Sequence, residues 1–153
     1  MQNFSEIQAL MKSDMEKTDE ILIDRLNSNV GLINQMSHYI IASGGKRLRP
    51  LLLLLSARAS NYTGTDHHSM AVVIELIHTA TLLHDDVVDE STTRRGQDSA
   101  NELWGNAPSV LVGDFLYSRA FEIMVEPNSM AIMRILSKAT NQIAEGEVLQ
   151  LLN

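Results

Sequence analysis

Three aspartates stand at the end of one apolar stretch, in the run HDDVVDE. On a helix, residues four apart lie on one face, so Asp85 and Asp89 stack and Asp86 lies about 100° around the axis. Two unit charges about 5 Å apart repel by roughly 3 kcal/mol at an effective dielectric of about 20. Hard oxygen ligands of this kind suit Mg²⁺, which takes one or two carboxylates together with phosphates. We therefore predict a magnesium–phosphate site; the alternative is a solvated acidic helix end.

A basic loop, GGKRLRP over residues 44–50, is the second stretch that could do chemistry. Pro50 suits the first turn of a helix, so Lys46, Arg47 and Arg49 gather at a helix N-terminus. Cations are unfavourable there by about 0.3–1 kcal/mol each, unless an anion lies among them. The two glycines let the backbone approach such an anion. The loop is either an anion-binding loop or a solvated basic one.

Further charged and polar residues lie near the aspartates in sequence. His78 precedes Asp85 by seven residues and lies on nearly the same helix face; a phosphate contact and a hydrogen-bonded core histidine are its two interpretations. Arg94 and Arg95 follow the aspartates in a polar loop. They either balance the acidic charge or clamp phosphate oxygens, which the planar guanidinium suits. His84 lies on a different face and receives no role.

The elements that position these groups are predicted to be helices. Apolar residues at helical spacing and cap residues predict helices over about 5–27, 30–42, 50–60, 69–89, 106–125 and 130–152. Ser5 and Gln8 have the spacing of a capping box at the start of the first helix. Trp104 is expected to pack, whereas His67 and His68 are expected to face solvent without a role. Because the sequence has no strand pattern and no internal repeat, the predicted fold class is all-α.

Composition narrows the class of protein further. The 153 residues are 44% hydrophobic and carry a net charge of −7, which predicts one globular domain and argues against nucleic acid or anionic membrane as a general partner. The sequence has no cysteine, so disulfide and thiol chemistry are excluded. The N-terminal residues have no signal-peptide character, and the apolar run Leu51–Leu55 is far shorter than the roughly 20 residues that cross a bilayer. A cytoplasmic protein without a transmembrane segment is expected.

The order of the motifs is similar to that of a known family. GGKRLRP, then IHTATLLHDDVVDE, RRG, NAPSVLVGDFLYSRAF and IAEGEVLQL together resemble the trans-type polyprenyl diphosphate synthases, in particular bacterial long-chain enzymes of the octaprenyl type. The resemblance implies an all-α isoprenoid synthase bundle around a deep cavity. It implies a Mg²⁺-dependent homodimeric prenyltransferase that condenses isopentenyl diphosphate with an allylic diphosphate, for a quinone side chain. Such enzymes ionise the allylic diphosphate to a cation, which the double bond of isopentenyl diphosphate attacks before a proton is lost.

The resemblance also gives roles to the charged residues. The first aspartate-rich motif of the family, which binds Mg²⁺ at the allylic diphosphate, is matched by Asp85, Asp86 and Asp89. Positions that hold isopentenyl diphosphate are matched by Lys46, Arg49, His78 and Arg95. Arg94 matches a contact to the allylic diphosphate, and Arg47 matches the basic loop without a defined contact.

Product length is implied by two small residues before the aspartates. Thr81 lies one helical turn before Asp85, and Ala80 is beside it. In the family, large aromatic residues at these positions act as a floor that stops elongation early. The small side chains here therefore predict an open tunnel and a long product; the alternative is that they only let neighbouring helices pack closely.

One departure from the family pattern concerns its second aspartate-rich motif, which does not occur up to Asn153. Residues 1–153 are therefore expected to be the N-terminal part of a single synthase domain and to be inactive alone. The alternatives are a shorter-chain synthase and a non-catalytic or split subunit of a heteromeric enzyme; the intact metal motif argues against a purely non-catalytic subunit. GGKRLRP argues against a head-to-head enzyme of the squalene type. The lack of alternating oxygen ligands argues against an EF-hand-like metal buffer.

Overall fold

A computed structural model describes residues 3–153 of the chain. Its elements are α1 (Phe4–Leu10), α2 (Lys12–Arg25), α3 (Gly31–Ala42), α4 (Leu48–Ala59), α5 (Asp66–Val88), β1 (Thr93–Arg94), β2 (Gln97–Asp98), α6 (Ala100–Trp104), α7 (Asn106–Met124) and α8 (Met130–Leu151). Met1 and Gln2 lie outside the described residues. They begin the N-terminal segment in which the sequence predicts no signal peptide.

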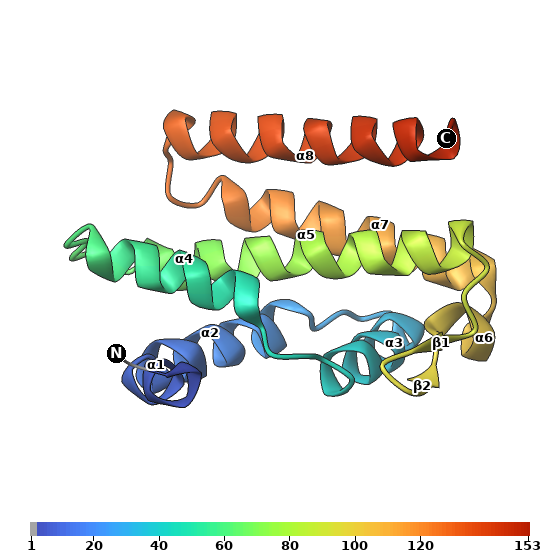
Figure 1. Ribbon diagram of the computed structural model, residues 1–153, viewed down its shortest axis with the longest axis horizontal. Helices are drawn as coiled ribbons and strands as arrows, with labels where there is room; N and C mark the ends of the chain where they lie inside the picture. Colours follow the sequence, from blue (N-terminus) through green and yellow to red (C-terminus); the bar gives the residue numbers. More distant parts are fainter. Residues whose placement is uncertain (1–2) are drawn as a thin grey trace.

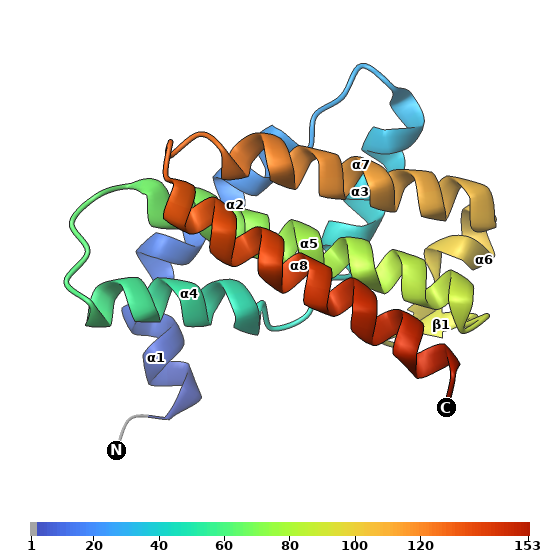
Figure 2. The same ribbon diagram turned by 90° about the horizontal axis from the view of Figure 1, so that it is seen from above.

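The helix α5 is the centre of the molecule. It packs most extensively against α7, and further against α4 and α2. Figure 1 shows α8 as a layer over α5 and α7, with α1, α2, α3, α6 and the small β-hairpin on the opposite side. From above, α8 crosses α5 obliquely and diverges from α7 (Figure 2). The predicted all-α architecture is confirmed.

The core is built around α5 because that helix is apolar on almost every side. A helix without a continuous polar face is stable only when other helices cover it. Val72, Val73 and Ala80 of α5 have no exposed surface, and Leu76 is 1% exposed. They share one cluster with apolar side chains of α2, α3 and α7. The aspartates at the end of α5 are thus carried on a rigid, buried element.

The N-terminal helix begins and ends differently from the prediction. The capping box is formed by Asn3 and Glu6, not by Ser5 and Gln8: Asn3 Oδ1 accepts from the Glu6 amide at 2.9 Å, and Glu6 Oε2 accepts from the Asn3 amide at 3.2 Å. The continuous helix expected over 5–27 is divided at Met11, whose backbone leaves helical geometry and whose side chain is only 2% exposed. The chain changes direction at this buried methionine, between α1 and α2 (Figure 1).

A β-hairpin occupies the loop in which no strand was predicted. β1 and β2 pair antiparallel, with Arg94 opposite Gln97. Arg95 (φ 51°) and Gly96 (φ 78°) form the turn between them. Positive φ at both positions is the geometry of a type I′ turn, whose twist matches that of the flanking strands. The strands are two residues each, too short to show an alternating pattern in the sequence.

The start of α5 also differs from the prediction. The helix begins at Asp66, three residues earlier than expected, and its first turn carries His67 and His68. Their side chains are 13% and 15% exposed and face Asp14 of α2, so the expectation that they face solvent is wrong. The prediction for Trp104 is confirmed, because its ring packs edge-on against Tyr39 with centroids 5.2 Å apart.

Helix α8 is sparsely covered for its length. Within the described residues it contributes no buried side chain, and only its N-terminal half packs on the core, through Ile132, Met133 and Leu136. Ile135, Val148 and Leu151 are 62–68% exposed. Across residues 3–153, no helix has both the length and the apolarity needed to cross a membrane.

Candidate functional site

The aspartates form an acidic rim where α5 ends. Asp85 is half-buried, and Asp89, the C-cap residue of α5, is exposed. The pKa of Asp85 is raised to about 6 by burial, first, and by the neighbouring carboxylates of Glu147 and Asp89, against the opposing effect of Arg94. The carboxylate crowding predicted from the sequence is therefore present on this face.

Glu147 of α8 is a site residue that sequence reasoning missed. Its carboxyl lies near enough to Asp85 to raise the pKa of that aspartate, and it also contributes to the raised pKa of Tyr117, after burial and Asp85. Glu147 stands in the IAEGEVLQL stretch, but helical spacing alone gives no sign that α8 crosses the end of α5. The acidic rim therefore comprises carboxylates from two helices.

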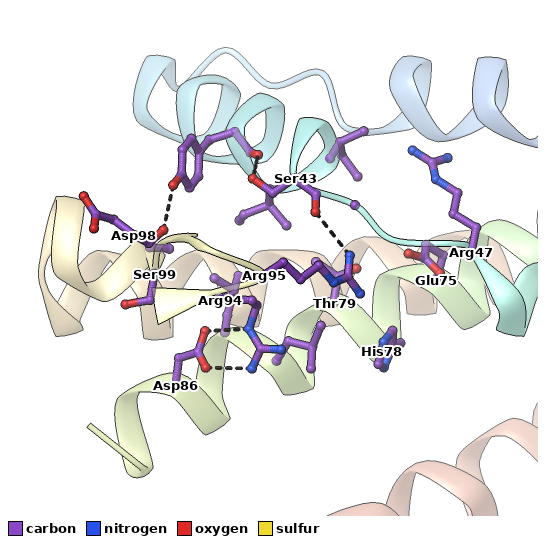
Figure 3. A pocket seen from close by; sticks show the side chains of 17 residues that line it. Ser43, Arg47, Glu75, His78, Thr79, Asp86, Arg94, Arg95, Asp98 and Ser99 are labelled. Carbon is purple, nitrogen blue, oxygen red and sulfur yellow. Dashed lines mark hydrogen bonds and ion pairs between the residues drawn. The ribbon is translucent and has the colours of Figure 1, made fainter. Parts of the chain in front are cut away.

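Asp86 differs from its neighbours because it is buried and paired. It is 4% exposed. Arg94 Nε donates to Asp86 Oδ2 at 2.8 Å and Arg94 Nη2 donates to Oδ1 at 2.6 Å (Figure 3). This two-point contact raises the pKa of Arg94. Of the two interpretations of Arg94, charge balance is the one seen in this structure, and it fixes the guanidinium beside the rim.

The hairpin that carries Arg94 and Arg95 is attached to α3. Tyr39 Oη donates to the Asp98 carbonyl at 2.6 Å, and Ser43 Oγ donates to Gln97 Oε1 at 2.9 Å. Arg95 Nη1 donates to the Ser43 carbonyl at 3.2 Å (Figure 3). These contacts hold the turn so that Arg94 faces the rim and Arg95 faces the basic loop.

The structure explains why a glycine stands at position 45 in GGKRLRP. A Cβ at this position would lie 2.6 Å from Cζ of Arg95, so any other residue would displace the guanidinium. The glycine therefore permits the hairpin and the basic loop to meet. This close approach joins two motifs that are 50 residues apart in the sequence.

Four predicted anion-binding residues line one open pocket between the basic loop, α5 and the hairpin: Lys46, Arg49, His78 and Arg95. Arg49 Nη1 lies 3.3 Å from His78 Nε2. Because a guanidinium only donates, His78 Nε2 is the acceptor and its proton lies on Nδ1. Burial lowers the pKa of His78, as do Arg49 and Arg95. The pocket is therefore strongly cationic with a neutral imidazole in its wall.

Arg47 is bound differently from the other cations of its loop. Its backbone is left-handed (φ 51°), and its guanidinium forms an ion pair with Asp19 of α2. Glu75 of α5 also lines this pocket; burial raises its pKa, and Arg47, Arg49 and Arg95 oppose that rise. Arg47 thus fastens the loop to α2, and Glu75 offsets part of the positive charge.

The two small residues considered for product length lie in different surroundings. Thr81 lines an apolar recess between α5 and α8, and its hydroxyl donates to the His78 carbonyl at 2.6 Å. The recess continues along α5 past Ile77 and Ile74 and is closed on the other side by α8 residues including Ile143. Ala80 is fully buried in the main core. It therefore packs on neighbouring helices, and Thr81 faces the recess.

His84 fixes the distance between α5 and α7. Its Nε2 lies 3.0 Å from the Val110 carbonyl oxygen and 3.4 Å from Asp114 Oδ1. A Cβ at Gly113 would overlap the His84 imidazole. The glycine in VGDF therefore lets α7 approach the last turns of α5, where the aspartates lie.

The chain is similar in sequence to known proteins. The sequence profile of the family described as Polyprenyl synthetase matches residues 30–153. The chain is 53% identical over 151 residues to octaprenyl diphosphate synthase of Escherichia coli K12, an alignment that covers 99% of this chain and 47% of that protein. It is 45% identical over 147 residues to all-trans-nonaprenyl-diphosphate synthase (geranyl-diphosphate specific) of Rhodobacter capsulatus, covering 95% of this chain and 45% of that one.

Solved structures give the same result. A polyprenyl synthase of Caulobacter crescentus CB15, complexed with calcium and isoprenyl diphosphate, superposes with a TM-score of 0.92 at 50% identity, over 95% of this chain and 44% of that one. The fold is thus the all-α bundle of the isoprenoid synthases, as the resemblance implied. The chain belongs to the polyprenyl synthetase family. It spans about half the length of the curated relatives it matches.

Proposed function

We propose that residues 1–153 are the N-terminal part of a single long-chain trans-polyprenyl diphosphate synthase domain of the octaprenyl type. The reaction is the condensation of isopentenyl diphosphate with an allylic diphosphate. The observation that carries the proposal is the convergence of Lys46, Arg49, His78 and Arg95 on one pocket, whose His78 precedes Asp85 by seven residues on α5. The names of the octaprenyl and nonaprenyl relatives support a long product.

Mg²⁺ is the proposed metal, held by Asp85 and Asp89 with Asp86 beside them. The donors are all carboxylate oxygens, which suit Mg²⁺, and the pKa of Asp85 of about 6 reflects burial and, after it, the repulsion of neighbouring carboxylates. A divalent cation removes that repulsion. The calcium in the Caulobacter relative is also a divalent cation that prefers oxygen ligands. When bound, the metal neutralises charge that develops on the departing diphosphate.

The protein side chains divide the two diphosphates between them. Lys46, Arg49 and Arg95 bind isopentenyl diphosphate, with the neutral His78 holding Arg49 in place. Arg94, fixed on Asp86, lies where it can reach the allylic diphosphate. Preorganised cations of this kind stabilise charge on a leaving group without reorganisation at the moment of reaction. The chain needs no protein nucleophile for this chemistry.

The growing hydrocarbon is proposed to run along the recess beside Thr81, away from the diphosphates.

A homodimer is proposed as the assembly. Helices α7 and α8 carry apolar side chains that are 60–65% exposed, among them Leu111, Val148 and Leu149. They support an interface on these helices. Apolar patches of this kind mark sites of association.

Binding of inorganic pyrophosphate to the chain, followed by calorimetry with and without Mg²⁺, tests the proposal. We expect Mg²⁺ to tighten binding, and we expect that gain to disappear in Asp85→Asn. Arg49→Gln should weaken binding in both conditions. Lys17→Gln, which removes an exposed cation of α2 paired with Glu20, is the matched control and should bind like the parent. A Mg²⁺ effect that survives in Asp85→Asn would overturn the assignment of the rim.

A further inference from the structure

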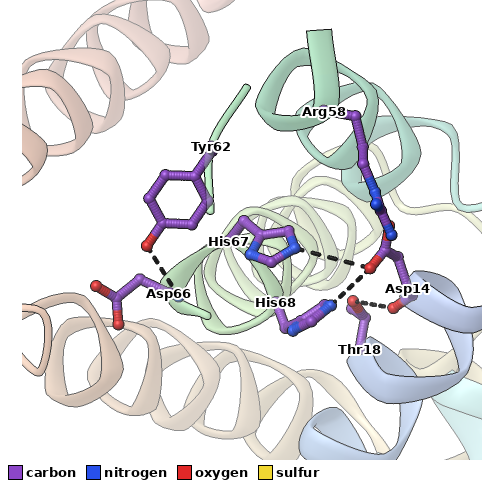
Figure 4. Close-up of polar contacts among 7 residues, drawn as sticks. All are labelled: Asp14, Thr18, Arg58, Tyr62, Asp66, His67 and His68. Carbon is purple, nitrogen blue, oxygen red and sulfur yellow. Dashed lines mark hydrogen bonds and ion pairs between the residues drawn. The ribbon is translucent and has the colours of Figure 1, made fainter. Parts of the chain in front are cut away.

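A second cluster of metal-ligating groups lies at the other end of α5. Asp14 of α2 is 5% exposed, and three side chains converge on its carboxylate (Figure 4). His68 Nε2 lies 2.9 Å and His67 Nε2 3.7 Å from Asp14 Oδ1, while Arg58 Nε donates to Oδ2 at 2.8 Å. Two imidazoles therefore face the same carboxylate oxygen.

His67 is left with an unsatisfied nitrogen in this arrangement. Its Nε2 is too far from Asp14 for a hydrogen bond, and its Nδ1 is buried without a hydrogen-bond partner among residues 3–153. Burial lowers the pKa of His67, and His68 and Arg58 lower it too, against the opposing effect of Asp14. The net lowering favours the neutral ring. With the proton on Nδ1, that N–H is buried without an acceptor and the lone pair of Nε2 faces a carboxylate; with the proton on Nε2, the lone pair of Nδ1 is buried without a donor. Both are unfavourable.

We propose that Asp14, His67 and His68 bind a transition-metal ion of the Zn²⁺ class. Their ligand atoms all lie within 4.8 Å of one another. Tetrahedral Zn²⁺ with bonds of about 2.0–2.1 Å separates its ligands by roughly 3.4 Å, and the two carboxylate–imidazole distances, 2.9 and 3.7 Å, lie on either side of that value. A cation between these atoms uses the lone pair of His67 and leaves a position for water.

The donor set distinguishes this site from the acidic rim. Imidazole nitrogens suit Zn²⁺, Co²⁺ or Ni²⁺, whereas Mg²⁺ prefers oxygen. Arg58 occupies the other oxygen of Asp14 and orients the carboxylate, as outer hydrogen-bond partners of metal ligands do. His67 and Asp85 are 18 residues apart on one helix, which separates the two sites by about 27 Å. The ion would join α2 to the start of α5, so its role is structural.

The test is a titration of the chain with Co²⁺, followed by its visible absorption, and then displacement by Zn²⁺. We expect one Co²⁺ per chain with the intense bands of tetrahedral coordination, and a rise in Tm with Zn²⁺. His67→Gln and His68→Gln should each weaken binding by about 100-fold or more, given that loss of an outer-shell partner alone costs 10–100-fold. His67→Gln is the cleaner variant, because within the described residues His67 makes no hydrogen bond that the change removes.

A control variant locates the ion. His38→Gln changes an exposed histidine of α3 and should bind Co²⁺ like the parent. The proposal is overturned if the parent chain fails to bind Co²⁺ at micromolar concentration. It is equally overturned if His67→Gln and His68→Gln bind as the parent does.

Discussion

Arg94 holds both carboxylate oxygens of Asp86, with Nε 2.8 Å from Oδ2 and Nη2 2.6 Å from Oδ1. One residue earlier, Asp85 has the carboxylates of Glu147 and Asp89 as neighbours. Adjacent aspartates of one motif therefore differ in their electrostatic surroundings. An arginine compensates Asp86, which fixes the hairpin on α5, and Asp85 keeps an excess of negative charge that a cation can neutralise.

Asp85→Ala or Asp89→Ala in a complete synthase should lower turnover by about 100-fold or more, since each removes a ligand that stabilises charge on the leaving diphosphate. The folded state should lose little stability, because each change relieves repulsion. Steady-state kinetics and thermal unfolding measure the two effects. Near-normal turnover in either variant would remove the case for a metal at the rim.

Asp86→Ala provides the contrast to these variants. It leaves Arg94, whose side chain is 35% exposed, without its partner, so a loss of about 1–3 kcal/mol in the free energy of unfolding is expected. If Asp86→Ala and Asp89→Ala were equally stable, the proposed division between the two aspartates would be wrong.

The stability of the metal-free chain should depend on pH through Asp85. Its pKa is raised to about 6 in the folded state, against about 3.9 in the unfolded chain, so between these values the folded state binds more protons. Stability should therefore fall as pH rises from about 4 to about 6. Asp85→Asn should flatten this slope and raise Tm at pH 7. Thermal unfolding in chelator across this window measures it, and an unchanged slope in Asp85→Asn would assign the dependence to another group.

Neutralising the basic pocket should separate the two substrates kinetically. Lys46→Gln or Arg49→Gln in a complete synthase should raise KM for isopentenyl diphosphate by about tenfold or more, with a smaller effect on the allylic diphosphate. The physical reason is the loss of a charge-assisted contact, worth about 1.5–3 kcal/mol. Lys17→Gln is again the matched control. Equal increases for both substrates would argue against a dedicated pocket.

The isolated chain should self-associate. Its α7 and α8 expose apolar side chains such as Leu111, Ile135 and Val148 at 62–68% of their surface, and large apolar patches favour association. Sedimentation velocity at micromolar concentration should show dimers or larger species, and Val148→Glu should shift the distribution toward the monomer. A well-dispersed monomer of the parent chain would contradict the prediction.

Much of this site was predictable because its residues are local in sequence. Asp85 and Asp89 share a face through helical spacing alone, and the cations of GGKRLRP cluster at a helix start whatever the tertiary structure is. The apolar character of α5 likewise indicated a buried central helix. These features depend on periodicities of three and four residues, which a sequence displays directly.

The features that were missed depend on contacts between distant segments. Glu147 meets Asp85 only because α8 crosses the end of α5. His67 and His68 were expected in solvent, and they are covered because Asp14 comes from a helix more than 50 residues earlier. The hairpin at Arg95 arises from a two-residue turn with short strands. Neither helical periodicity nor composition encodes such contacts. The resemblance to a family gives the order of the motifs along the chain, but not which residues of different motifs touch.

The last prediction concerns product length, and the structure separates two residues that the sequence treats alike. Thr81 faces the recess between α5 and α8, whose wall continues through Ile77 and Ile74, whereas Ala80 has no exposed surface in the core. Thr81→Phe in a complete synthase should therefore fill the recess one helical turn from Asp85, so that elongation stops after fewer condensations while the first remains largely intact. Ala80→Phe should overpack the core and lower Tm, at a cost of about 1–3 kcal/mol.

Chromatography of the dephosphorylated products decides between these expectations. Thr81→Val, which keeps the size of the side chain, is the matched control and should leave the distribution unchanged. A long-chain distribution from Thr81→Phe identical to that of the parent would show that the hydrocarbon takes another path. Shortening by Ala80→Phe alone, without loss of Tm, would place the floor on the opposite face of α5, toward α7.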